Sequence, residues 1–298
     1  MTQSSRLPIL YRTYKPLHNL LTWCGKLQIA GKHPFIVLRN LLNRLLFSTI
    51  FTVPETRLIT TDDNFVIAAP LNDQSATSIL FEKRYSPLES GILSKLLPLT
   101  KGFIDVGANL GYFSLLARQV MGDDYPVMTI EPNHHLCLLI ENSITQNQFA
   151  PMMLYQIAIG DKRGKAYLIV DNTLSSNTRV VTTSVIHPHI QQVVEIIPLN
   201  ELIDTSISAP LFVKIDVEGH EVQVLNGGTM LFKHRAWILC ELQSQSYQAV
   251  SDMLNHYDYK MLTLDGTAIG NYPTAQRFDL LLIPVEAHQT VINALKVV

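Results

Sequence analysis

The 298-residue chain contains only three cysteines, and none of them belongs to a closely spaced pair. Cys24, Cys137 and Cys240 are far apart, and no CxxC sequence occurs. This excludes the ligand spacing of a zinc site and a dense disulfide framework. It is typical of a reduced protein, so we expect a cytoplasmic location. A strongly basic composition is also missing, because the net charge is −2, and this argues against general nucleic-acid binding.

No apolar run is long enough to cross a bilayer. The most apolar segment, residues 35–51, is interrupted by two arginines and two asparagines at helical spacing. This pattern predicts an amphipathic helix rather than a membrane span. The first 16 residues lack a long apolar centre, so we expect no secretory signal.

Acidic residues are absent from the first 54 positions, which carry seven Lys and Arg residues. The remainder holds 16 basic residues and all 25 acidic ones. One interpretation is a helical extension with solvated basic side chains. The other is contact with an anionic membrane surface or an anionic substrate. We therefore predict a basic helical extension over residues 1–55, with peripheral membrane contact as an open alternative.

From about residue 100, short apolar runs alternate with segments of helical spacing. This alternation predicts a parallel sheet covered by helices on both faces, in a doubly wound α/β domain. We expect this domain to span residues 99–298, after a small β/α segment over residues 56–98. The predicted strands cover residues 103–106, 127–132, 152–161, 211–219, 236–243, 259–265 and 278–285.

Two segments depart from the alternation. Residues 56–84 resemble strands separated by turns at "TDDN" and "LNDQ". Further on, the β segments "GKAYLIV" and "VVEIIPL" flank a polar loop at residues 171–192. We interpret this part as an insertion beside the carboxyl edge of the sheet, where loops often determine substrate specificity.

The sequence also lacks the two common phosphate-binding motifs, GxGxxG and GxxxxGK[ST]. In their place, "FIDVGANLGYFS" puts Asp105 at the end of a predicted strand, before Gly107, Asn109 and Gly111. A carboxylate at this point would repel a pyrophosphate. Gly107 lets a ligand approach the backbone, and Gly111 lets the helix and strand pack closely.

A second acid, Glu131, ends the next predicted strand 20 residues after Gly111. An acid in this place commonly binds ribose hydroxyls. A ligand that is free of phosphate, positively charged and ribose-bearing fits the description of S-adenosylmethionine. A glycine-rich turn with a purely structural role stays open as the alternative.

A third cluster of polar residues follows a later strand, in "FVKIDVEGHE". Its acids Asp216, Glu218 and Glu221 fit a helix cap and first-turn acids that favour the helix dipole. That explanation accounts less well for Gly219 and His220. We therefore regard the cluster as a candidate site at the ligand-binding edge of the sheet.

At these residues the chain resembles the FkbM family of S-adenosylmethionine-dependent methyltransferases. The resemblance rests on "FIDVGANLGYFS", the acid in "TIEPN", "AIGD" and "VKIDVEGHEVQVLNGG", in family order over residues 80–285. It implies a seven-stranded class I methyltransferase (Rossmann-like) sheet with strand order 3-2-1-4-5-7-6 and an antiparallel last strand. It also implies O-methylation of a hydroxyl on a sugar, a glycan or glycolipid, or another natural product.

The resemblance further implies roles for individual residues. Glu131 would bind the ribose hydroxyls, and the segment from Gln156 to Ala158 would lie near the adenine. Glu89 matches a stretch that the family uses near the cofactor, although an ordinary surface glutamate is an equal alternative. The methionine and ribose end of the cofactor would be lined by Asp105, Gly107, Asn109 and Gly111.

An alcohol that accepts a methyl group loses its proton, and histidine is a suitable base near neutral pH. Our candidate base is His220, with Asp216 or Glu218 orienting it or the acceptor. A histidine that only caps or packs the helix is the alternative. We assign no metal, while noting that Asp216, Glu218 and Glu241 carry ligands that suit Mg²⁺.

Two other functions stay open. One is a nicotinamide-dependent oxidoreductase on a Rossmann fold, which the missing GxGxxG motif disfavours. The other is a non-catalytic relative that binds the cofactor only. The expected partner is a small-molecule or glycan acceptor rather than a nucleic acid, and nothing in the sequence indicates an oligomeric state.

Overall fold

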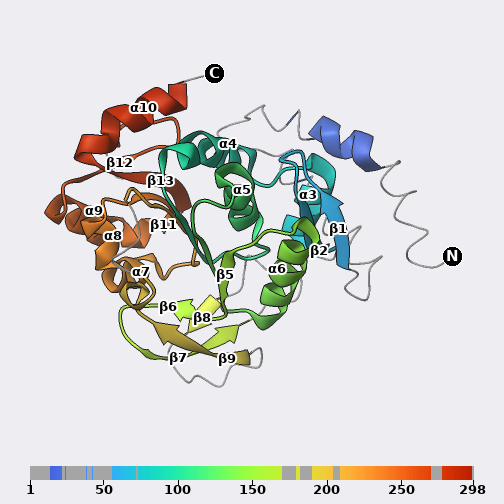
Figure 1. Ribbon diagram of the computed structural model, residues 1–298, viewed down its shortest axis with the longest axis horizontal. Helices are drawn as coiled ribbons and strands as arrows, with labels where there is room; N and C mark the ends of the chain where they lie inside the picture. The colour runs from blue at the N-terminus through green and yellow to red at the C-terminus, as the bar shows by residue number, and fades with distance from the viewer. Residues whose placement is uncertain are drawn as a thin grey trace.

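The computed structural model describes residues 14–21, 24, 38, 42, 56–71, 73–169, 179–181, 190–203, 209–269 and 277–296. Most of the helix predicted over residues 35–51 and of the polar loop at residues 171–192 lies outside the described residues. Figure 1 shows a central sheet between two layers of helices, with a smaller sheet at one end of the molecule. Within the described part of the chain, no helix is both long and apolar enough to cross a membrane.

The central sheet has seven strands in the order β12-β13-β11-β10-β3-β4-β5. Numbered along the chain within this sheet, the order is 3-2-1-4-5-7-6, which confirms the predicted topology. The last strand along the chain, β13, runs antiparallel to both neighbours, and the other neighbouring pairs are parallel. The strands are β3 (Phe103–Val106), β4 (Val127–Ile130), β5 (Met152–Tyr155), β10 (Phe212–Ile215), β11 (Trp237–Gln243), β12 (Tyr259–Leu262) and β13 (Arg277–Pro284).

Successive side chains of each strand enter two separate hydrophobic cores, because a strand alternates its faces. Phe103 belongs to one core, and Ile104 and Val106 belong to the other. The first core includes side chains of α4 (Pro87–Leu96), α5 (Tyr112–Met121), α6 (His134–Asn147) and α10 (His288–Lys296). The second includes side chains of α7 (Glu221–Gly227), α8 (Thr229–Lys233) and α9 (Tyr247–His256).

The segment before the main domain begins with a β-hairpin. β1 (Thr56–Thr60) and β2 (Val66–Pro70) pair in antiparallel fashion around the turn that "TDDN" predicted. The expected further strand is instead a helix, α3 (Gln74–Glu82). The carboxylate of Asp73 accepts hydrogen bonds from the backbone N–H groups of Ser75 and Ala76, which is the geometry of a helix N-cap.

The predicted strand over residues 152–161 is divided between two sheets. β5 ends at Tyr155, and the chain then enters a four-stranded sheet of order β6-β9-β7-β8. β5 is the edge strand of the central sheet, so residues after it can pair elsewhere. The small sheet, at the bottom of Figure 1, contains β6 (Ala158–Ile159), β7 (Gly164–Ile169), β8 (Arg179–Val181) and β9 (Ile190–Ile197).

Candidate functional site

A cavity of about 300 Å³ lies where β3, β4 and β10 end. The carboxyl edge of a doubly wound sheet is the usual ligand site of this fold. The cavity is lined by the backbone turn after β3, by side chains after β4 and β10, and by Leu168 of the small sheet. Seven residues predicted for the site line it: Gly107, Asn109, Glu131, Ala158, Asp216, Glu218 and His220.

The turn after β3 is held in a conformation that requires glycine at one point. Gly107 has φ +81°, and a Cβ atom there would lie 1.9 Å from the carbonyl oxygen of Asp216. The backbones after β3 and β10 therefore touch at Gly107. Gly111 has φ +78° and faces Ile140 of α6. A Cβ atom at position 111 would lie 2.9 Å from Cγ1 of Ile140. Gly111 thus lets two helices pack and does not line the cavity.

The carboxylate of Glu131 is held by one backbone N–H of the turn after β3 and by the backbone N–H of the N-cap residue of α6. Its Oε2 accepts a hydrogen bond of 2.8 Å from the backbone N–H of Asn109, and its Oε1 accepts one of 2.9 Å from Asn133. Burial raises the pKa of Glu131 to about 7, and these two backbone donors oppose the shift. A carboxylate has about four lone-pair sites. About two remain for hydroxyl donors in the cavity.

Asp105 lies behind the cavity wall instead of in it. Its side chain is fully buried, and its Oδ2 accepts a hydrogen bond of 2.7 Å from the hydroxyl of Ser114. Burial raises the pKa of Asp105, and the positive charge of Lys214 opposes this shift. Strand alternation explains the difference from the prediction, because Asp105 points to the α5 face of the sheet. Its direct contact with a cofactor stays a prediction.

The residues of the segment predicted to lie near adenine, Gln156 to Ala158, differ in their positions. Ala158 is buried and lines the cavity. Gln156 is exposed, and its Oε1 lies 2.8 Å from Nδ1 of His134, which is also exposed. Ile157, which belongs to the same predicted segment, also lines the cavity. The apolar wall here is thus formed by Ile157 and Ala158.

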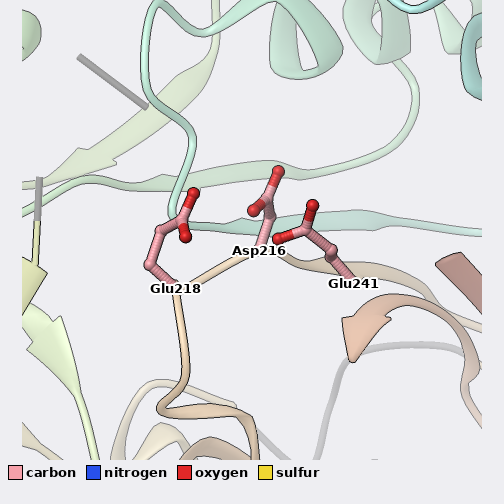
Figure 2. A group of neighbouring side chains, drawn as sticks. All are labelled: Asp216, Glu218 and Glu241. Carbon is pink, nitrogen blue, oxygen red and sulfur yellow. The ribbon is translucent and has the colours of Figure 1, made fainter. Parts of the chain in front are cut away.

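Three carboxylates converge beside the loop after β10, as Figure 2 shows. One oxygen from each of Asp216, Glu218 and Glu241 lies within 4.8 Å of the others. Two basic residues accompany them. Lys214 Nζ is 2.8 Å from Asp216 Oδ2, and Arg277 Nη1 is 2.6 Å from Glu218 Oε2 and 3.7 Å from Glu241 Oε2.

Sequence reasoning missed both basic partners. Lys214 is visible as a single charge inside an apolar strand, which is a signal of a buried ion pair. Arg277 belongs to β13 and is more than 50 residues from Glu218 along the chain. It lies beside Glu218 because β13 pairs with β11 in the sheet. The Mg²⁺ alternative stays a prediction, and a guanidinium already neutralises part of the carboxylate charge.

Burial raises the pKa values of both carboxyl groups next to Arg277. Burial raises the pKa of Glu241 to about 8, and the charges of Asp216 and Glu218 add to the shift. Burial also raises the pKa of Glu218, while Arg277 opposes the change. Glu218 has φ +54°, which is uncommon outside glycine and requires support from surrounding contacts. Its ion pair with Arg277 is one such contact.

His220 is the residue just before α7, and it lines the cavity. Its side chain makes no capping hydrogen bond, so the capping alternative does not describe it. Burial lowers its pKa, and the nearby Asp161 opposes the shift, so the imidazole is neutral at pH 7. The predicted orienting carboxylates have other partners: Asp216 pairs with Lys214, and Glu218 pairs with Arg277.

Glu89 does not line the cavity. It is half-buried and hydrogen-bonded to Asp279 of β13. Burial raises the pKa of Glu89 to about 7. Glu89 and Asp279 extend the group of carboxyl groups around Lys214. Burial raises the pKa of each, and the positive charge of Lys214 opposes both shifts. Tyr85, just before α4, contributes to the cavity wall and was also missed in the sequence.

Comparison with protein families matches residues 105–261, more than half of the chain, to the Methyltransferase FkbM domain. No curated protein matches the chain. Among solved structures, similarity is found to methyltransferase FkbM from Methylobacillus flagellatus, with 14% identity and a TM-score of 0.42. That alignment covers 83% of this chain but only 59% of the other, so this chain spans less than two thirds of that protein's length.

Two further structures are comparably similar. The O-methyltransferase from Bacillus cereus in complex with SAH is 11% identical, over 70% of this chain and 86% of that chain, with a TM-score of 0.42. The O-methyltransferase TomG from Streptomyces achromogenes, involved in tomaymycin synthesis and in complex with SAM, is 12% identical, over 72% and 87%, with a TM-score of 0.42. Since these scores are below 0.5, the fold assignment rests on the strand order itself.

Proposed function

The chain belongs to the FkbM family of methyltransferases, whose methyl donor is S-adenosylmethionine, and from this premise we propose that it methylates a hydroxyl oxygen. The acceptor we propose is a sugar, a glycan or glycolipid, or another natural product. When bound, S-adenosylmethionine supplies a methyl group on a positively charged sulfur that leaves as a neutral thioether. The enzyme therefore has to align the acceptor oxygen and remove its proton.

The observation that carries the proposal is the position of Glu131 in the cavity wall. Two backbone N–H groups hold its carboxylate, and lone pairs are left for ribose hydroxyls. Gly107 and Asn109 would hold the adjoining part of the cofactor, and Ile157 and Ala158 would contact the adenine. The residues present therefore fit the cofactor.

The charge of the cavity agrees with a cationic ligand. Among the described residues, four carboxylates line it, those of Glu131, Asp216, Glu218 and Glu241, against the one guanidinium of Arg277. Ionised carboxylates at short range favour a positive charge and disfavour phosphate groups, and a bound cation would in turn favour the ionised forms of Glu131 and Glu241, whose pKa values burial raises. This supports a sulfonium cofactor over a nicotinamide dinucleotide.

His220 is the base in this proposal. A neutral imidazole can accept the proton of the acceptor hydroxyl while the new carbon–oxygen bond forms. The lowered pKa keeps His220 unprotonated at neutral pH, although it also makes the ring a weaker base. The ion pair between Glu218 and Arg277 offers hydrogen-bond partners that suit a polyhydroxylated acceptor.

Ligand-dependent thermal unfolding tests the cofactor half of the proposal. A ligand that binds only the folded state raises Tm by mass action. We expect S-adenosylmethionine and S-adenosylhomocysteine to raise Tm and NAD to leave it unchanged. Glu131→Gln keeps the size of the side chain and removes the carboxylate charge, and it should weaken S-adenosylhomocysteine binding by about tenfold, or about 1.4 kcal/mol. Stabilisation by NAD alone would refute the proposal.

The catalytic half is tested with His220→Ala and the exposed control His135→Ala. We expect His220→Ala to retain S-adenosylhomocysteine binding and to lose turnover by about 10²-fold or more, the usual contribution of a general base. His135→Ala should behave as wild type. Equal turnover in both variants removes His220 as the base. If the wild-type protein binds S-adenosylhomocysteine and methylates no acceptor, it is a non-catalytic relative of the family.

The acceptor and the compartment require experiments in cells. Mass spectrometry of glycans and small molecules from cells with and without the gene should reveal a product that lacks one methyl group.

We propose a cytoplasmic location, which the three free thiols support. Cell fractionation followed by detection of the protein checks this.

A further inference from the structure

A helix at residues 14–21 is attached to the body of the protein by one face. Tyr14, His18 and Leu21 on this face are at most 6% exposed. The rings of Tyr14 and His18 lie 5.4 Å and 4.8 Å from the ring of Phe81 in α3, between centroids. Figure 1 shows this helix in blue at the periphery of the molecule, beside α3. The body therefore fixes the orientation of the helix.

The neighbouring face of this helix exposes leucines. Leu17 is 42% exposed and Leu20 is 54% exposed, and their spacing of three puts them on one side. Further along, Leu38 is 43% exposed, whereas Leu42 packs against the core of the body. Of the ten exposed large apolar side chains in the described parts of the chain, three come from the eleven described residues before residue 55. Exposed apolar side chains are thus concentrated in this short region.

The charge of the same region indicates an anionic partner. Residues 1–54 of the chain carry seven Lys and Arg residues and no acidic residue, whereas the rest of the chain has 16 basic and 25 acidic residues. An anionic membrane would attract the first part and repel the second. Leucines flanked by basic residues are the composition of a helix that lies in the headgroup layer of a bilayer.

We propose that the helix at residues 14–21 binds the surface of an anionic membrane. Leu17 and Leu20 enter the boundary between headgroups and acyl chains, and the net positive charge of residues 1–54 adds electrostatic attraction to the anionic lipids. The acidic body stays on the aqueous side. This inference is independent of the methyl acceptor and concerns where the enzyme works.

Vesicle co-sedimentation of the full chain tests the proposal. Vesicles of phosphatidylcholine alone are compared with vesicles that contain about one third phosphatidylserine, at salt concentrations of about 0.1 M and 1 M. We expect binding to the anionic vesicles at low salt, much weaker binding at high salt and little binding to neutral vesicles. The paired substitution Leu17→Glu and Leu20→Glu should lower the partition coefficient by at least about tenfold per leucine, from the transfer free energy of the side chain.

A control with the same chemistry uses two exposed leucines elsewhere. Leu99 and Leu138 are 44% and 48% exposed, and the pair Leu99→Glu and Leu138→Glu introduces the same charge outside the helix. We expect this control to bind vesicles as wild type does, and both double variants to keep the wild-type Tm. An equal loss in the two double variants overturns the proposal, as does equal binding of wild type to neutral and anionic vesicles.

Two further outcomes also overturn it. The first is the absence of any sedimentation of wild type with anionic vesicles. The second is a dimer in light scattering that Leu17→Glu with Leu20→Glu converts to a monomer, together with no vesicle binding. In that case the leucines form a contact between two copies of the chain.

Discussion

Lys214 is a buried cation that pairs with Asp216 of the site. It is 6% exposed, its Nζ contacts the carboxylate of Asp216 at 2.8 Å, and it lies 4.8 Å from the ring centroid of Phe113. Burial disfavours its charged form, but Asp216 and Asp105 together raise its pKa above the ordinary value. The cation therefore stays charged and neutralises carboxylates that burial would otherwise disfavour.

Replacing this cation leaves carboxylates without a partner. We expect Lys214→Met to lower the free energy of unfolding by about 3 kcal/mol, the low end for a broken buried pair, because Asp216 keeps part of its surface in water. The loss should be smaller at low pH, where Asp105 is protonated. Urea unfolding at two pH values measures both effects.

Lys162→Met is the matched control, since Lys162 is exposed. It should change the free energy of unfolding by less than about 0.5 kcal/mol, as surface substitutions usually do. An equal effect of the two substitutions would contradict the role given to Lys214.

At the scale of elements, the contact between the turns after β3 and β10 shapes the cavity. Gly107 touches the carbonyl of Asp216, and the backbone N–H of Asp216 donates to the carbonyl of Val106 at 3.0 Å. The same turn donates from Asn109 to Glu131 after β4. Backbone groups and the carboxylate of Glu131 thus hold three strand ends together, which fixes the cavity walls relative to one another.

The two glycines of this turn should respond differently to alanine. In both, the left-handed backbone costs about 1–2 kcal/mol for a residue with a Cβ. At Gly107 the new atom also meets a backbone carbonyl, whereas at Gly111 it meets the side chain of Ile140. We expect a loss of more than about 3 kcal/mol for Gly107→Ala and about 2 kcal/mol for Gly111→Ala.

Chemical denaturation of the two variants measures this difference, and calorimetry with S-adenosylhomocysteine measures its effect on the cavity. Gly107→Ala should also weaken that binding, because Gly107 lines the cavity and Gly111 does not. Equal losses of stability, with equal binding, would mean that the turn adapts at both positions.

At the scale of the whole molecule, carboxyl groups whose pKa values are raised by burial are concentrated in and beside the cavity. The pKa is raised to about 7 for Glu131 and Glu89 and to about 8 for Glu241. A raised pKa means that the folded state binds more protons than the unfolded state between the unfolded value of about 4.5 and the folded value. The contribution of these groups to the free energy of unfolding is therefore fully present below about pH 4.5. It is lost as the pH rises through about 7 to 8.

Glu131→Gln isolates one of these groups, because glutamine cannot ionise. Without ligand, the free energy of unfolding of wild type should fall relative to Glu131→Gln by up to about 3 kcal/mol between about pH 5 and about pH 8, from the pKa rise of Glu131. The other carboxyl groups are common to both proteins and cancel. A difference that is constant across this range would contradict the raised pKa.

The sequence by itself determined the sheet and the place of the cavity. Apolar runs of strand length that alternate with helical spacing allow few arrangements, and the family motifs specified the order of the strands. Gly107, Glu131 and His220 could be found because each directly follows a strand or opens a helix at the carboxyl edge. Their positions along the chain already fix which edge of the sheet they occupy.

The tertiary structure alone decided which charged groups meet. Asp105 and Gln156 were expected in the cavity, but strand alternation turns the first toward α5, and the second lies exposed between two sheets. Arg277 reaches Glu218 because β13 inserts beside β11, a pairing between distant segments. Local sequence records the spacing of neighbours along the chain, whereas ion pairs and pKa values depend on burial and on distances between strands. For that reason the pairing of Arg277 with Glu218 became visible only in the fold.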